Sequence, residues 1–283
     1  MIVTKLYGGL GNQLFQFWSS LEYAKRNNYN LCFDVRAFDI KSPGTTKRKI
    51  EILELISFFE NYKINNFFDN FKYDLLCKIG RMTLLKDRQN GRLINQKNSQ
   101  NLILDGHWQN YHNLINSREY IKKTMFKLKK YSLNDFGISS DKSLMIHVRR
   151  GDYVSNSKAN RHHGVLSREY FLKAFETIHS HKKLENVLVF SEDLEWCKKN
   201  LEFNLKTSFI HDFENLSPMD YLLLMSEAEN FVLSHSSYSW WAAFLGENMN
   251  SKIIMPSIWD KFSAINIDRL ALPKWSILET KID

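Results

Sequence analysis

Two adjacent arginines, Arg149 and Arg150, directly follow an apolar run that predicts a buried strand. They belong to the segment HVRRGDY, residues 147–153. A planar guanidinium group donates two parallel hydrogen bonds, which suits it to phosphate oxygens. In an open α/β sheet, ligands bind at the carboxyl ends of the strands. The pair is therefore a candidate phosphate site, although adjacent arginines also form ordinary surface ion pairs.

The residues beside the two arginines extend this candidate site. His147 lies on the same predicted strand, where its imidazole can contact a ribose or the edge of a base. Asp152 follows the arginines and can orient one of them or close the loop.

Serines precede a predicted helix within SHSSYSWWAAFLG, residues 234–246: Ser234, Ser236, Ser237 and Ser239. Hydroxyl groups and free N–H groups at a helix N-terminus form a natural anion site. The adjacent Trp240 and Trp241 are expected to pack in the core. One helix earlier, Asp220 can accept the N1–H and N2–H of guanine, or it can merely stabilise the helix dipole.

A glycine turn near the N-terminus resembles a dinucleotide fingerprint only in part. Gly9 and Gly11 supply the first two glycines of G-x-G-x-x-G, and Asp34 can serve as its acidic residue. Leu14 stands where the third glycine belongs, and its side chain would obstruct the close contact of helix and strand. A structural turn remains an alternative. We favour a turn that presents Asn12 and backbone N–H groups to a polar ligand.

Composition and charge narrow the class of protein. The 283 residues are 43% hydrophobic and 25% charged, as in folded globular proteins. The net charge of +8 fits an anionic partner, but no nucleic-acid motif accompanies it. The basic run IKKTMFKLKK, residues 121–130, is either a solvated helix face or a membrane-surface helix. Three scattered cysteines and no long apolar run favour a cytoplasmic protein that does not span a membrane.

Strands and helices alternate along most of the chain. A β-turn-α-β unit opens it, residues 40–100 have no clear pattern, and a second α/β series begins near Asp141. Such alternation predicts parallel sheets covered on both faces. We expect two Rossmann-like domains, residues 1–140 and 141–283.

Five ordered motifs together resemble the α-1,2-fucosyltransferase family, which uses GDP-L-fucose. They are GGLGNQLFQ, DGHWQN (105–110), HVRRGDYV, SEDLEWCKKN (191–200) and SSYSWWAAFL (236–245). The resemblance implies an α/β, GT-B-like fold of two facing Rossmann-like domains. The N-terminal domain would be largely on the acceptor side, and the C-terminal domain would bind GDP-fucose.

The resemblance also implies roles for single residues. Arg149 and Arg150 would hold the diphosphate, with Arg150 at the β-phosphate. His147 and Asp220 would lie near the nucleoside, and Ser236 and Ser237 would donate to the phosphates. Gly11 and Asn12 of the other domain would meet the fucose or its phosphate.

The implied reaction is a single displacement that inverts the anomeric carbon and moves fucose to the 2-hydroxyl of a terminal β-galactose. The sequence contains no D-x-D metal motif, so preorganised arginines would neutralise the leaving phosphate without a metal or another cofactor. Residues 153–168 contain no Asp or Glu. Asp152 is therefore one candidate base and His147 a weaker one, and loosely assisted proton loss is a further possibility.

The partners follow from the same resemblance: GDP-fucose and a lipid-linked, β-galactoside-terminated oligosaccharide at the inner membrane, used to build a surface polysaccharide such as O-antigen. His162 and His163 either contact the acceptor or form an exposed loop pair. Three rival functions remain: a glycosyltransferase of another linkage, an NAD-dependent oxidoreductase, and a non-catalytic glycan- or nucleotide-binding module.

Overall fold

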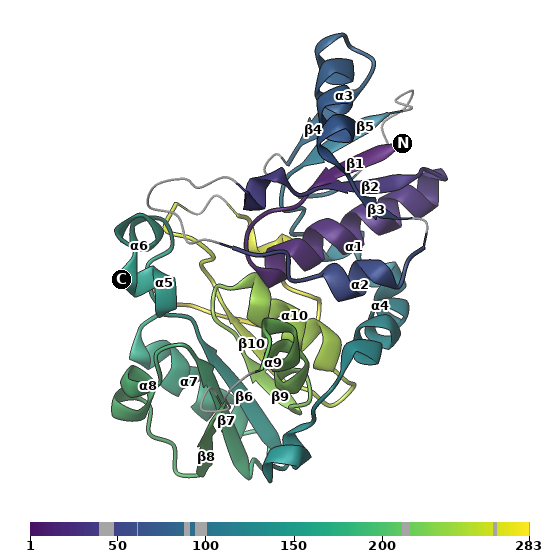
Figure 1. Cartoon of the computed structure of the whole chain (residues 1–283). Helices are drawn as coiled ribbons and strands as arrows, with labels where there is room; N and C mark the ends of the chain where they lie inside the picture. The colour runs from purple at the N-terminus through teal and green to yellow at the C-terminus, as the bar shows by residue number, and fades with distance from the viewer. Residues whose placement is uncertain are drawn as a thin grey trace. The chain divides into compact units, whose positions relative to one another are not determined.

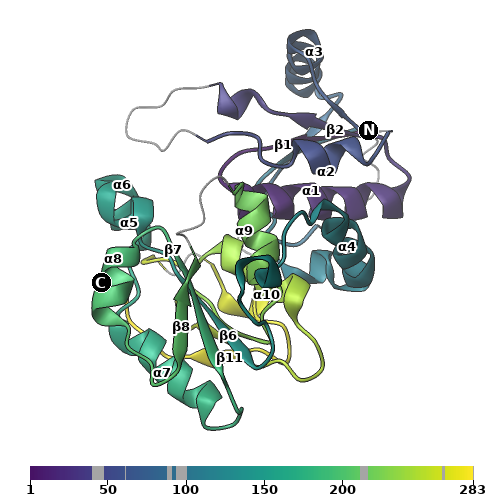
Figure 2. The same ribbon diagram turned by 60° about the horizontal axis from the view of Figure 1, so that its bottom comes forward.

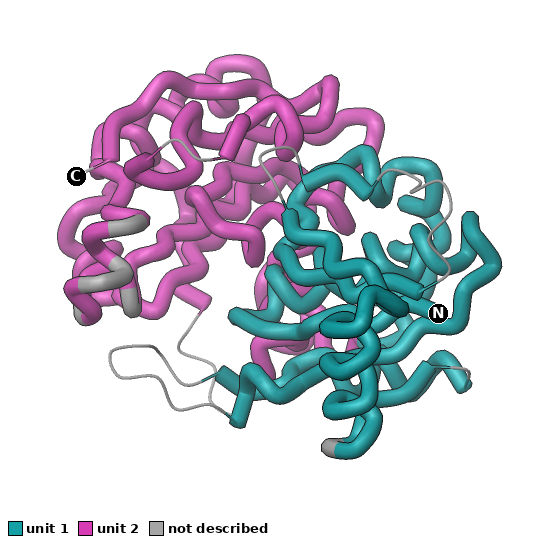
Figure 3. The backbone as a smooth tube through the Cα atoms, turned by 90° about the horizontal axis from the view of Figure 1, so that it is seen from above, with its two compact units in different colours: residues 1–128 teal, residues 129–283 magenta. Residues whose placement is uncertain are grey.

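The computed structural model describes residues 1–39, 48–60, 62–87, 91–93, 101–210, 216–262 and 265–282, without the side chains of 67, 152, 155, 158, 159 and 162. It divides into unit 1, Met1–Leu128, and unit 2, Lys129–Asp283 (Figure 3). This division comes earlier than the expected boundary at 140/141. The reason is that Glu227 accepts the backbone N–H of Leu133 at 2.9 Å and pairs with Lys129 at 2.9 Å, which ties the connecting segment to unit 2.

Unit 1 is built on a parallel sheet with the strand order β3-β2-β1-β5-β4. Its strands are β1 (Ile2–Lys5), β2 (Leu31–Asp34), β3 (Lys63–Ile64), β4 (Thr83–Lys86) and β5 (Leu102–Asp105). Its α-helices are α1 (Leu10–Asn27), α2 (Leu53–Ser57), α3 (Phe67–Lys78) and α4 (Arg118–Met125) (Figure 1).

Helices cover both faces of this sheet because strand side chains alternate between them. On one face, Thr4 of β1 donates to Ser20 of α1 at 2.8 Å. On the other face, Tyr73 of α3 is buried with strand residues Val3, Cys32 and Ile103. Leu14 of α1 is completely buried, so the position that a dinucleotide fingerprint reserves for glycine is a core position here.

The glycine turn and helix α1 follow the expected order. Gly9 is the N-cap of α1, and Asn28 ends the helix in the left-handed region with a φ of 54°. Gly8 has a φ of +82°, and a Cβ there would lie 2.8 Å from Nδ2 of Asn12. The turn therefore requires glycine at position 8.

The apolar residues of the basic run belong to the core of unit 1. Ile121 and Met125 of α4, with Leu128 after it, are buried, while Phe126 is 37% exposed. The run therefore turns its lysines to solvent, as expected of a solvated helix face. None of the helices in the described ranges has the length and apolar character that crossing a bilayer requires.

Unit 2 is built on a second parallel sheet with the strand order β11-β10-β9-β6-β7-β8. Its strands are β6 (Ser143–Val148), β7 (Asn186–Ser191), β8 (Lys206–Phe209), β9 (Asn230–Val232), β10 (Ile253–Pro256) and β11 (Ser276–Leu278). Its α-helices are α5 (Gly151–Ser155), α6 (Ser157–His163), α7 (Arg168–His179), α8 (Leu194–Asn200), α9 (Pro218–Met225) and α10 (Ser237–Gly246) (Figure 2).

Alternate residues of β6 face opposite layers of helices. Ile146 lies in the buried cluster that contains Phe171 and Phe175 of α7. On the other face, the ring of His147 lies 5.8 Å from that of Tyr238 of α10. Trp240 and Trp241 of α10 are fully buried, as expected.

The two α/β units with parallel sheets confirm the expected fold class, while their facing arrangement stays an expectation from the resemblance. Two local expectations were wrong. The chain after β6 forms α5 and α6 rather than a loop, and helix α10 begins at Ser237, so Ser237 and Ser239 belong to the helix instead of preceding it.

Candidate functional site

The arginine pair stands at the carboxyl end of β6, opposite two acids at the end of β7. The parallel register pairs Val148 with Ser191, so the next residues of both strands lie side by side. Nε of Arg150 donates to Oδ2 of Asp193 at 2.9 Å, and Arg149 forms an ion pair with Glu192. The site therefore holds two cations above two fixed carboxylates.

Aromatic rings support both guanidinium groups. Arg150 lies 4.2 Å from the ring centroid of Trp196 in α8, and Arg149 lies 5.1 Å from that of Tyr153 in α5. The side chain of Arg150 is only 15% exposed. Within the described residues, the hydrogen bond from Arg150 to Asp193 is donated by Nε and does not involve the two Nη groups. Its two Nη groups are therefore positioned to donate to an anion.

Ser234 fixes the backbone from which the arginines project. It is completely buried after β9. Its hydroxyl donates to the carbonyl oxygen of His147 at 2.6 Å and accepts the backbone N–H of Arg149 at 3.0 Å. Ser234 therefore serves the scaffold of the site rather than the ligand.

The N-terminus of α10 lies on the same edge of unit 2. Ser236 is its N-cap, and the Ser236 hydroxyl accepts the backbone N–H of Tyr238 at 3.3 Å. Ser236 is 8% exposed and Ser237 is half-buried. The Ser236 hydroxyl oxygen thus accepts the capping hydrogen bond, and its hydroxyl hydrogen can still donate to a phosphate.

His147 and Asp220 have defined structural surroundings. The ring of His147 packs beside Tyr238, and the hydroxyl of Tyr238 donates to the carbonyl oxygen of Pro218 at 2.5 Å. Asp220 forms a capping box with Ser217: its Oδ2 accepts the backbone N–H of Ser217 at 2.9 Å and its hydroxyl at 2.6 Å. Helix capping therefore occupies one carboxylate oxygen of Asp220.

Gly11 and Asn12 lie in the first turn of α1 in unit 1. Gly11 is buried, and Oδ1 of Asn12 accepts a hydrogen bond from Nε2 of Gln109 at 2.7 Å. The structure therefore joins the glycine-rich motif to the DGHWQN motif. Whether these residues meet the donor sugar stays a prediction.

The segment after the arginines contains the remaining candidates. Asp152 lies in α5, and the side chains of Asp152 and His162 fall outside the described part of the structure. His163 ends α6, and its ring stacks on Tyr153 at 4.5 Å with an interplanar angle of 11°. His163 therefore helps to hold Tyr153, the ring beneath Arg149.

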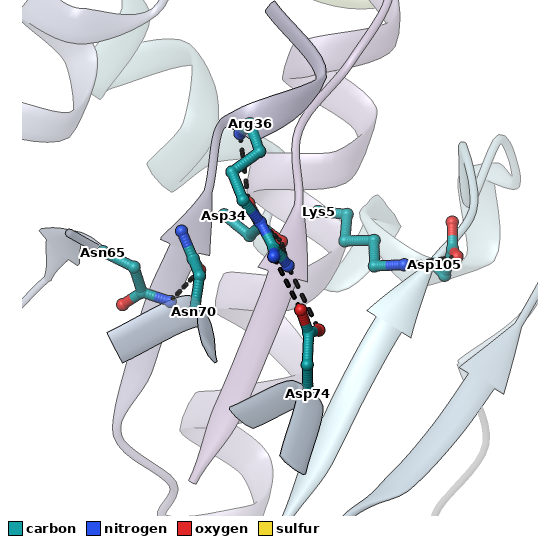
Figure 4. Close-up of polar contacts among 7 residues, drawn as sticks. All are labelled: Lys5, Asp34, Arg36, Asn65, Asn70, Asp74 and Asp105. Atoms are coloured by element: carbon teal, nitrogen blue, oxygen red, sulfur yellow. Dashed lines mark hydrogen bonds and ion pairs between the residues drawn. The ribbon is translucent and has the colours of Figure 1, made fainter. Parts of the chain in front are cut away.

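Asp34, the acid considered for a dinucleotide site, forms an ion pair with Arg36. Asp34 is 5% exposed and receives Nε and Nη2 of Arg36, the latter at 2.7 Å. Arg36 also donates to Asp74 of α3 at 2.6 Å (Figure 4). With Leu14 in the core, this ion pair disfavours the oxidoreductase alternative.

Sequence reasoning missed the roles of Glu192, Asp193 and His235. The two acids directly follow a predicted strand, and this position could have indicated that they lie at the ligand-binding edge of the sheet. His235 lies between two site serines and is 1% exposed. Burial, and secondarily the charge of His163, lowers the pKa of His235 to about 4. It therefore stays neutral near pH 7. The described residues contain no cluster of three or more His, Cys, Asp or Glu suited to a metal ion.

Comparison with known proteins places this chain in a family. Residues 56–279 match the family described as Glycosyl transferase family 11. The Alpha-1,2-colitosyltransferase of Escherichia coli is 28% identical over 291 residues, covering 99% of each chain. The O-antigen biosynthesis glycosyltransferase WbnK of Escherichia coli is 26% identical, covering 95% of this chain and 98% of that protein.

A third relative is matched only in part. Galactoside alpha-(1,2)-fucosyltransferase 1 of Leontocebus fuscicollis is 28% identical over 102 residues, covering 35% of this chain and 28% of that protein. Since the family match covers well over half of its length, the chain belongs to glycosyl transferase family 11.

Proposed function

We propose that this glycosyltransferase moves L-fucose from GDP-β-L-fucose to the 2-hydroxyl of a terminal β-galactose, with inversion at the anomeric carbon. The observation that carries the proposal is the pair Arg149 and Arg150, held over Glu192 and Asp193 at the carboxyl end of β6. The names of the family relatives support the α-1,2 linkage.

The chemistry of the arginine pair fits the leaving group. As the bond from fucose to GDP breaks, negative charge grows on the β-phosphate. The Nη groups of Arg150 would donate to that phosphate, and Arg149 would add charge beside it. Because Trp196 and Asp193 already fix Arg150, little reorganisation would be needed during the reaction. We therefore expect activity without a metal.

The acceptor hydroxyl must lose a proton during the transfer. We propose Asp152 as the first candidate for this base, because it lies in α5 two residues after Arg150. His147 is the weaker candidate, because the residue is only 4% exposed and its ring packs beside Tyr238.

We further propose that the natural acceptor is the lipid-linked precursor of a surface polysaccharide, used on the cytoplasmic side of the membrane. The name of the relative WbnK, an O-antigen biosynthesis glycosyltransferase, supports this acceptor class.

Product analysis tests the reaction. The protein is mixed with GDP-fucose and lactose in excess EDTA, and the product is identified by NMR. We expect 2′-fucosyllactose from the wild type and at least a hundredfold less from Arg150→Ala. A different linkage would refute the acceptor position. A requirement for added metal would refute metal independence.

A second donor has a specific observation in its favour. The relative aligned over 99% of both chains is named a colitosyltransferase. Colitose is L-fucose without its 3-hydroxyl group, and a site built to bind that hydroxyl rejects the analogue strongly. The ratio of kcat/KM for GDP-fucose and GDP-colitose decides between them. A ratio above one supports fucose transfer, and a ratio below one supports colitose transfer.

A further inference from the structure

Helix α3 of unit 1 carries an apolar stripe on its solvent side. The stripe residues and their exposed fractions are Phe68 80%, Phe71 63%, Leu75 50% and Ile79 56%. The opposite side of the helix packs on the sheet, where Asn70 is 3% and Tyr73 6% exposed. The stripe residues are therefore different from the residues that pack α3 against the sheet.

Helical geometry gathers these residues and places a lysine on each flank. At 3.6 residues per turn, the four side chains fall within an arc of about 80°. Lys72 and Lys78 project roughly 20° beyond the two edges of that arc, and both are exposed. A lysine in this position can lay its aliphatic stem along apolar surface and keep its ammonium group in a polar layer.

The acids of α3 are neutralised by other cations. Asp69 pairs with Lys63 at 3.4 Å, and Asp74 pairs with Arg36 at 2.6 Å. Arg81, just beyond the helix, is exposed and adds positive charge near the end of the stripe. The exposed side of α3 is therefore apolar along the stripe and cationic on both flanks.

The stripe belongs to a well-formed helix rather than to a frayed segment. Asn66 caps α3 in a capping box with Asp69. Figures 1 and 2 both show α3 standing apart from α1, α2 and α4, the other helices of its unit. Contiguous exposed apolar surface with a polar rim marks an interaction site.

We propose that the α3 stripe inserts into the interfacial layer of a bilayer that contains anionic lipids. Its aromatic and aliphatic side chains would enter the acyl boundary, while Lys72 and Lys78 contact the headgroups. The charge of the flanks favours an anionic surface over a neutral one. This inference rests on the proposed lipid-linked acceptor. It places the membrane contact on α3 rather than on the basic run 121–130, because the apolar residues of that run are mostly buried.

Co-sedimentation with vesicles of phosphatidylcholine, with and without phosphatidylglycerol, tests the proposal. We expect the wild type to bind only the anionic vesicles. The double variant Phe71→Ser/Leu75→Ser should lower the partition coefficient between vesicle and water at least tenfold. The reason is that it removes several carbon groups that would be buried in the bilayer. The matched control Met249→Ser/Phe262→Ser removes side chains that are 88% and 66% exposed in unit 2, and it should bind as the wild type does.

Charge reversal separates the two basic regions. Lys72→Glu/Lys78→Glu should abolish binding, and Lys123→Glu/Lys127→Glu on the basic run should reduce it much less. Fucosyl transfer to soluble lactose, measured on every variant, reports the fold and the proposed function independently of vesicle binding. Normal binding by Phe71→Ser/Leu75→Ser would overturn the proposal, as would an absence of wild-type binding. A wild-type dimer that this variant makes monomeric would assign the stripe to a second copy instead.

Discussion

Asp193 links helix α8 to the arginine pair. Its Oδ2 accepts Nε of Arg150 at 2.9 Å, while its Oδ1 accepts the backbone N–H of Trp196 at 3.2 Å. Trp196 in turn lies 4.2 Å beneath the guanidinium group of Arg150. One carboxylate thus caps the helix and orients the arginine, so that the start of α8 and the proposed phosphate site form one structural element.

Asp193→Asn should weaken donor binding while preserving the helix. Asparagine is a good N-cap, but it removes the negative charge that holds Arg150. We expect KM for GDP-fucose to rise about tenfold, as for loss of one charge-assisted hydrogen bond. Glu192→Gln serves as the comparison, and its effect should be smaller because Glu192 pairs with Arg149 rather than with Arg150, the residue proposed for the β-phosphate. Steady-state kinetics measure both, and equal KM values for Asp193→Asn and the wild type would contradict the account.

Ser234→Ala should destabilise unit 2 and reduce activity together. The variant removes the hydroxyl that bonds to the carbonyl oxygen of His147 and to the backbone N–H of Arg149, at a cost of about 1–3 kcal/mol. Ser239→Ala is the control, since Ser239 is equally buried but its hydroxyl makes longer bonds of 3.2 and 3.5 Å. Denaturant unfolding should give a lower free energy of unfolding for Ser234→Ala than for Ser239→Ala. The reverse order would refute the structural role of the Ser234 hydroxyl.

His235 should make the protein less stable in mild acid. Its folded pKa of about 4 lies below the ordinary value of 6.5, so the unfolded chain takes up a proton that the folded chain excludes. The contribution of neutral His235 to the free energy of unfolding is complete above pH 6.5 and is lost as the pH falls toward 4. The loss should approach about 3 kcal/mol. Urea unfolding between pH 7.5 and 4.5 should show a shallower decline for His235→Phe than for the wild type. Parallel declines would exclude His235 as a cause.

Gly246→Ala should destabilise unit 2 strongly. A Cβ there would lie 2.2 Å from the carbonyl oxygen of Ser226 and 2.6 Å from Cζ of Phe231. The cost should be about 3 kcal/mol, as for other overpacked cores. Gly137→Ala is the control: its φ of +69° disfavours alanine, but no described residue other than its chain neighbours lies within 4 Å of a Cβ there, so about 1–2 kcal/mol is expected. Thermal unfolding of the pair measures the difference, and equal losses would contradict the close packing.

The elements that the sequence predicts best depend on local signals. The α9 cap is an example, because Ser217, Pro218 and Asp220 stand at the spacing of a capping box and form one in the structure. Helix α3 was missed because apolar residues lie on both of its sides: Tyr73 is buried, while Phe68 and Phe71 face solvent. With polar Asn70 also buried, the spacing of the apolar residues does not reveal which side packs on the sheet.

The site was only partly predictable for a different reason. Arg149 and Arg150 are recognisable from their residue type and their place after a strand. Their pairing with Glu192 and Asp193 depends on the register of Val148 with Ser191, which is set by packing between segments far apart in the sequence. The sequence therefore predicts the cations of the site, and the fold adds their counter-charges.

Calorimetric titration with GDP in excess EDTA tests whether Arg149 and Arg150 form the diphosphate site. If Arg149 and Arg150 form the diphosphate site, the wild type binds GDP without metal, and Arg150→Ala binds at least tenfold more weakly while still unfolding in one cooperative transition. Lys199→Ala, which removes a cation from the same region outside the pair, should bind GDP as the wild type does. Equal affinity of Arg150→Ala and the wild type for GDP would contradict the account.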